Sequence, residues 1–104
     1  MSRGPDAATL LERALRASGE KAGCVVDILR SDMTRWASAT FTGARHLMTL
    51  TGHASPAFDG WIAALPDAEL CLRGHLVADC VVMRVIYDAS RAVATIEVLT
   101  LEEG

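Results

Sequence analysis

Residues 69–101 (ELCLRGHLVADCVVMRVIYDASRAVATIEVLTL) most constrain how this chain folds, because they are rich in β-branched and apolar residues. The segment from His75 to Tyr87 contains no helix breaker, and residues 88–91 (DASR) supply a short polar turn. A second apolar run, residues 92–101, follows this turn. The order predicts a long β-hairpin.

The first arm of this hairpin is apolar on both faces, whereas an antiparallel strand with one face in water would alternate more cleanly. Strict alternation places Leu76, Ala78, Cys80, Val82 and Ile86 on one face and Val77, Val81, Met83, Val85 and Tyr87 on the other. Two short helices from the same chain cover only one face of such a sheet. We therefore predict a two-fold homodimer that uses the open face or an edge of the sheet, with Val77, Val81, Met83, Val85 and Tyr87 in the interface.

Two helices are expected outside the hairpin. Residues 6–18 carry apolar side chains at helical spacing, with Asp6 as a capping residue and Gly19 as the closing glycine. The pair Ser55-Pro56 predicts the start of a second helix, which Pro66 ends.

Further strands are expected at residues 24–30, 35–42 and 45–51, with turns at 31–34 and at Gly43-Ala44. Residues 69–73 are expected to add one more strand before a bend at Gly74. The two halves thus share the order of a helix followed by strands. Residues 40–50 (TFTGARHLMTL) weakly resemble residues 71–81 (CLRGHLVADCV), but this similarity is too weak to indicate a repeat.

Together these elements predict a single α+β domain over residues 1–104, with residues 1–5 as a flexible N-terminus. One antiparallel sheet of five to six strands carries both helices on one face, in the order α-β-β-β-α-β-β(-β). The predicted core consists of Leu11, Leu15, Val26, Ile28, Phe41, Ile62, Leu65, Val81, Val85 and Ile96.

Composition narrows the class of protein. The chain has 104 residues, is 51% hydrophobic and carries a net charge of −3, which excludes disorder and gives no long-range attraction to nucleic acid or anionic membranes. No stretch approaches the roughly 20 apolar residues of a membrane span. Three cysteines without a CxxC spacing indicate reduced, buried thiols in a cytoplasmic protein, and nine arginines against one lysine indicate a GC-rich bacterial gene.

The densest group of metal-binding residue types comprises Cys71, His75, Asp79 and Cys80. Zinc ligand atoms lie about 2.0–2.3 Å from the metal. Residues four apart on a straight strand, however, are separated by roughly 13 Å. The sequence therefore predicts no metal site and no cofactor.

Three functions remain open. The leading prediction is a non-catalytic, self-associating interaction module. The second is a small-molecule binding protein or enzyme with a pocket near His46, His75 and Asp79, in which a histidine could act as a general base. Because no nucleophile, phosphate or metal motif completes a reaction, the sequence argues against an enzyme. The third is a nucleic-acid or regulatory protein, which would use Arg30, Arg35, Arg45 and Arg73.

Overall fold

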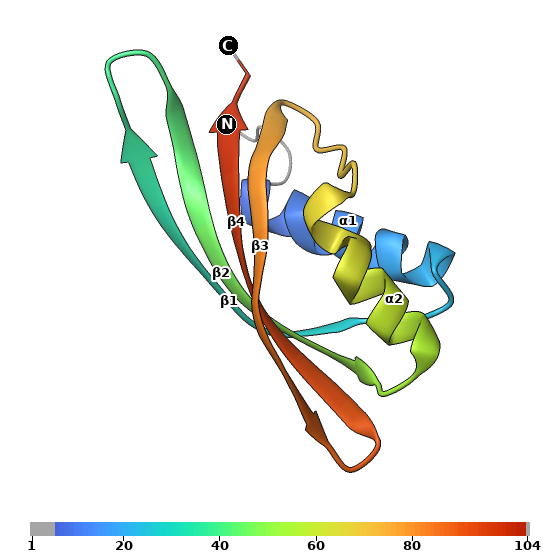
Figure 1. Ribbon diagram of the computed structural model, residues 1–104. Helices are drawn as coiled ribbons and strands as arrows, with labels where there is room; N and C mark the ends of the chain where they lie inside the picture. The colour runs from blue at the N-terminus through green and yellow to red at the C-terminus, as the bar shows by residue number, and fades with distance from the viewer. Residues whose placement is uncertain (1–5, 104) are drawn as a thin grey trace.

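The computed structural model describes residues 6–103 (Figure 1), so the predicted flexible N-terminus, residues 1–5, lies outside the described residues. The described residues form two α-helices, one short 3-10 helix and four strands. The elements in chain order are α1 (Ala7–Lys21), β1 (Asp27–Ala37), β2 (Thr42–His53), α2 (Pro56–Ala64), η1 (Leu65–Asp67), β3 (His75–Asp88) and β4 (Arg91–Glu102). The prediction of an α+β fold with one antiparallel sheet is confirmed.

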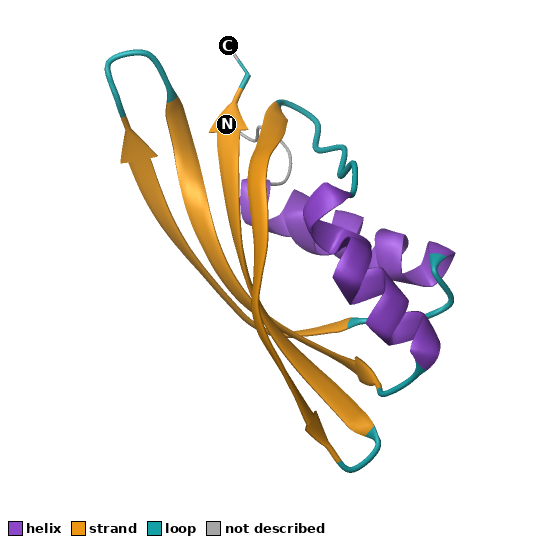
Figure 2. Cartoon of the chain, viewed as in Figure 1, coloured by secondary structure: helices purple, strands orange, loops and turns teal. Residues whose placement is uncertain are grey.

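Both helices lie on the same side of the sheet, which bends around them (Figure 2). The strand order is β1-β2-β4-β3, so β2 and β4 pair at the centre and β1 and β3 form the edges. The chain thus repeats a helix followed by a hairpin, and equivalent strands occupy equivalent places in the two halves. The weak sequence similarity aligns β2, a central strand, with the start of β3, an edge strand. Because these two strands are not equivalent, that similarity does not reflect the repeated arrangement.

The prediction of five to six strands is wrong, because β1 is one continuous strand through residues 31–34, where a turn was predicted. The hairpin turn lies instead at residues 38–41, and Gly43 lies inside β2. Residues 69–73 contribute only an isolated bridge between Leu72 and His75. The turn after Asp88 is confirmed, with Ala89 in the left-handed region at φ 52°.

The predicted caps explain where the helices start. Asp6 accepts a hydrogen bond from the amide of Thr9 at 2.9 Å, and Ser55 accepts one from the amide of Phe58 at 3.1 Å. Gly19, however, lies within α1 and does not close it. A Cβ at this position would stand 2.5 Å from Cγ2 of Val26, which favours glycine there. The helix ends at Lys21, and the left-handed residue that follows is Gly23, at φ 91°.

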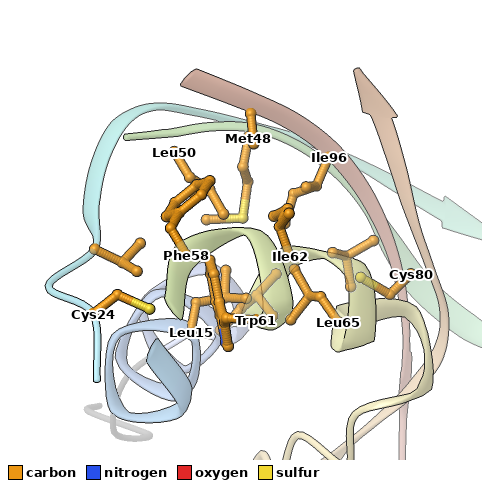
Figure 3. Packing of buried hydrophobic residues seen from close by; sticks show 14 of the residues in the cluster. Leu15, Cys24, Met48, Leu50, Phe58, Trp61, Ile62, Leu65, Cys80 and Ile96 are labelled. Atoms are coloured by element: carbon orange, nitrogen blue, oxygen red, sulfur yellow. The ribbon is translucent and has the colours of Figure 1, made fainter. Parts of the chain in front are cut away.

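The core lies between the helices and the sheet (Figure 3). Phe58 and Trp61 of α2 meet edge to face with their ring centroids 5.8 Å apart, and both rings lie in the same cluster as Met48 and Ile96 of the central strands. Six predicted core residues are buried: Leu11, Leu15, Val26, Ile62, Leu65 and Ile96. Ile28 and Val85 are partly buried against this core. Phe41 and Val81 are exposed, so their assignment to the core is wrong.

Candidate functional site

The register assigns each side chain of the sheet to one of two faces. On the central strands, the buried residues are the even-numbered ones from Ala44 to Leu50 and from Ala92 to Thr100, which therefore face the helices. Odd-numbered residues of β2 and β4 face the other side, which no helix within residues 6–103 covers. We call this side the open face.

Two irregularities in β3 reassign its side chains. The pairing with β4 shifts between Val77 and Asp79 and again between Val82 and Arg84. Each bulge adds one residue and so exchanges the faces of everything beyond it. Strict alternation along β3 is therefore wrong, and the predicted interface set does not share one face.

Val81 pairs with Glu97 and lies on the open face, whereas Val77, Val85 and Tyr87 pair with buried, helix-facing residues of β4. The Tyr87 hydroxyl donates a hydrogen bond to Asp59 of α2 at 2.6 Å. This bond raises the pKa of the phenol. Met83 is exposed and lies at the second bulge.

The open face presents large apolar side chains from three strands. Four of them are substantially exposed: Leu47 at 42%, Leu76 at 54%, Val81 at 43% and Ile86 at 46%. Val93, Leu99 and Leu101 of β4 are half-buried between them. Leu47, Leu76 and Ile86 were not predicted as interface residues. The regular alternation of side chains along β2 could have indicated that Leu47 faces outward. No such alternation holds along β3, because its two bulges change which residues share the face of Leu76 and Ile86.

Two ion pairs of opposite charge lie on the open face. Nε of Arg45 lies 3.9 Å from a carboxylate oxygen of Glu97, and Nε of Arg30 lies 2.6 Å from one of Asp32. Leu47 lies directly between Asp32 and Glu97 in the register. The face is thus apolar with ion pairs that cancel locally.

The side chain of Trp36 lies at one end of the open face, near the turn between β1 and β2. Its ring lies against Gly43 of β2, where a Cβ would stand 2.9 Å from the ring and 2.2 Å from the carbonyl oxygen of Thr100. Only glycine permits both approaches. The indole Nε1 is buried and has no hydrogen-bond partner among the described residues.

The three predicted ligand-binding residues do not all lie together. His46 faces the helices and is fully buried, and His75 lies at the start of β3 close enough to influence its titration. Asp79 is paired with Leu99 on the open face and accepts a hydrogen bond from the amide of Cys80 at 3.0 Å. The sheet therefore separates Asp79 from His46.

His46 makes one hydrogen bond, at 2.9 Å, between Nε2 and the hydroxyl of Thr100. Because that hydroxyl donates to the carbonyl of Ala44 at 3.5 Å, it accepts from Nε2–H, which leaves Nδ1 unprotonated. Nδ1 is buried and unpartnered within residues 6–103. Burial, aided by the nearby His75 and opposed by Asp6, lowers the pKa of His46, so the ring is neutral at pH 7.

The other reactive groups within residues 6–103 are not gathered at one place. Cys24 and Cys80 are buried, and burial raises the pKa of the Cys80 thiol to about 11. Cys71 is exposed, so the prediction that all three thiols are buried is wrong. In the part of the chain that the structure describes, no three His, Cys, Asp or Glu side chains are grouped to hold a metal ion. Two shallow hollows lined by described residues lie on the helical side, and neither includes His46 or His75.

Three of the four arginines that were predicted to bind nucleic acid lie close to a carboxylate. Arg30 and Arg45 form the two pairs described above, and Arg35 lies 3.3 Å from Glu102. The fourth, Arg73, is exposed in the loop before β3. These neighbours weaken the local positive potential that phosphate binding needs.

Comparisons with protein-family models, curated proteins and solved structures gave no match. None of the helices within residues 6–103 is long and apolar enough to cross a membrane.

Proposed function

We propose that this protein is a non-catalytic interaction module that associates with itself through the open face. The observation that carries the proposal is the exposure of Leu47, Leu76, Val81 and Ile86 on one side of a sheet whose two α-helices both lie on the other side. Contiguous apolar surface of this kind marks interaction sites.

The size of the face suits a stable contact. Four strands about 4.8 Å apart and about ten residues long cover roughly 19 Å by 33 Å, or about 600 Å². A standard interface buries about 800 Å² on each partner. Completing the burial of four half-exposed side chains on each of two copies contributes about 8 kcal/mol. This is of the same size as the loss of translational and rotational freedom on association, about 4–15 kcal/mol.

The charges favour a second copy as the partner. Arg45 with Glu97, and Arg30 with Asp32, give the face both signs of charge, and Arg84 and Asp79 add one more of each, so these charges cancel. A neutral face gives no electrostatic steering towards a strongly acidic or basic partner, whereas a mixed pattern is compatible with its own copy across a two-fold axis.

Leu47→Lys tests the proposal. The new ammonium group lies between the carboxylates of Asp32 and Glu97, which stabilise it within a single chain. The same charge lies in the middle of the open face and disfavours its burial against a second copy. We expect sedimentation velocity at micromolar to millimolar concentration to show an oligomer for the wild type and half its mass for Leu47→Lys.

Ala63→Lys is the matched control, because it adds the same charge on the exposed surface of α2, on the helical side of the molecule. It should keep the mass of the wild type. A wild type that sediments at its single-chain mass of 11.1 kDa, or a folded Leu47→Lys with unchanged mass, would contradict self-association through this face.

A further inference from the structure

The two edges of the sheet differ in how well they are protected. β3 carries two bulges, which disturb the ladder and make an edge a poor template for another strand. β1 carries one, between Ile28 and Arg30, and the segment Arg30–Ala37 then pairs with β2 without interruption. This segment, which we call the β1 edge, contains no proline and no lysine and is exposed along nearly its whole length.

The hydrogen-bond pattern shows which backbone groups of the β1 edge are free. Ser38 donates its amide to the carbonyl of Phe41 at 2.7 Å, and bonded and non-bonded pairs alternate along an antiparallel ladder. Every second residue of β1 before Ser38 therefore forms backbone hydrogen bonds with β2, namely residues 36, 34, 32 and 30. The N–H and C=O groups of Ser31, Met33 and Arg35 therefore point away from the sheet.

The opposite side of β2 gives the same assignment. Ala54 donates its amide to the carbonyl of Ser90 at 2.7 Å, so even-numbered residues of β2 bond to β4 and odd-numbered ones to β1. No strand within residues 6–103 receives the three outward amides of β1. The β1–β2 hairpin also projects beyond the helices (Figure 1), which leaves room for another strand beside it.

We propose that the β1 edge pairs antiparallel with the β1 edge of a second copy, across a two-fold axis at Met33, so that two sheets join into one of eight strands. This contact goes beyond the proposed use of the open face, because it uses backbone groups at the rim of the sheet and does not require the face to associate.

The charges of the strand are compatible with the chain's own copy and select this register. Outward groups meet only when the axis passes through a residue from 31 to 35. An axis at Asp32 sets two carboxylates opposite each other, and one at Arg35 sets two guanidinium groups opposite each other, which is unfavourable. An axis at Ser31 brings the bulge into the ladder.

The choice between Met33 and Thr34 rests on Trp36. With the axis at Met33, Trp36 lies opposite Arg30 of the second copy, and a guanidinium is attracted to the face of an indole. With the axis at Thr34, Trp36 lies opposite Asp32, whose negative charge the ring face repels. At Met33 no like charges lie directly opposite, and Asp32 is already neutralised by Arg30 of its own strand at 2.6 Å.

Met33→Pro tests the pairing. Proline at this position removes an amide that points outward and leaves the bonds to β2 in place, so the single chain keeps its fold. Met33→Thr is the matched control, because it shortens the same side chain and keeps the amide. Circular dichroism establishes that both variants fold, and Ser31→Pro repeats the test at a second outward position.

With both contacts present, we expect sedimentation velocity to give the wild type and Met33→Thr four times the 11.1 kDa of one chain. Met33→Pro should have half that mass, and Met33→Pro combined with Leu47→Lys should be a single chain. Met33→Pro at the wild-type mass overturns edge pairing and leaves the open-face proposal standing. Leu47→Lys at the wild-type mass overturns the open-face proposal and leaves edge pairing standing.

Amide hydrogen exchange on the unmodified protein gives an independent measurement. If the β1 edges pair, the amides of Ser31, Met33 and Arg35 exchange slowly, as do their neighbours bonded to β2. Fast exchange at these three positions, beside slow exchange at Asp32 and Thr34, overturns the proposal.

Discussion

Gly43 is the position where one added methyl group should be most harmful to the sheet. A Cβ at Gly43 would stand 2.2 Å from the carbonyl oxygen of Thr100 and 2.9 Å from the ring of Trp36. The first of these atoms is backbone on the neighbouring central strand and cannot rotate away. Gly43→Ala therefore forces β2 and β4 apart and also displaces the ring of Trp36.

Overpacking of this kind costs about 1–3 kcal/mol. For a domain of this size, each kcal/mol lowers the melting temperature by about 4–8 °C, so Gly43→Ala should melt roughly 5–20 °C below the wild type. Thermal unfolding followed by circular dichroism measures this change, and tryptophan fluorescence reports the displacement of Trp36.

Gly60→Ala is the matched control, because a Cβ at Gly60 has no neighbour within 4 Å. Gly60 lies inside α2, where alanine is favoured over glycine by about 0.5–1 kcal/mol, so this variant should melt a few degrees higher than the wild type. A Gly43→Ala protein as stable as the wild type would refute the close approach of β2 to Thr100 and Trp36.

The same glycine shows where the sequence could mislead. Before Ala44, Gly43 resembles the first residue of a tight turn, and Ser31-Asp32 resembles another turn. Both segments are strand, because β2 offers β1 a continuous ladder and Gly43 is needed for a close contact with β4. Local turn propensity is weaker than the pairing of two long strands.

Elements with strong local signals were predictable. Asp6 and Ser55 mark the two helix starts through hydrogen bonds that involve only neighbouring residues, and the turn after Asp88 closes a hairpin between adjacent strands. The position of the uncovered apolar surface was only partly predictable. That β3 has apolar side chains on both faces is visible in the sequence, but which of them faces outward depends on two bulges set by its pairing with β4.

Two further changes test the interior and the helix start. Ser55→Ala removes the hydroxyl that accepts from the amide of Phe58 at 3.1 Å, and it should lower the free energy of unfolding by about 1 kcal/mol in chemical denaturation. Ser55→Thr, which keeps the hydroxyl, should lose much less, and equal losses would contradict the capping role. Acidification should weaken the fold through His46, measured as the free energy of unfolding in urea between pH 7.5 and 5.

The sign of the His46 effect follows from its surroundings. Burial between the helices and the sheet, with His75 nearby, lowers the pKa of His46 below its ordinary value of 6.5, and Asp6 only partly offsets this. Above pH 6.5 the imidazole is neutral in both folded and unfolded chains. As the pH falls below 6.5, the unfolded chain binds a proton that the folded chain excludes. The free energy of unfolding therefore decreases, by at most about 1.4 kcal/mol per pH unit for one group.

His46→Gln isolates this contribution, because its amide N–H still donates to Thr100 but does not titrate, while His53 and His75 remain. The wild type should lose more free energy of unfolding than His46→Gln as the pH falls from 7.5 to 5. Identical pH profiles for the two proteins would mean that His46 takes up its proton as readily in the folded chain as in water, which a buried, unpartnered Nδ1 does not allow.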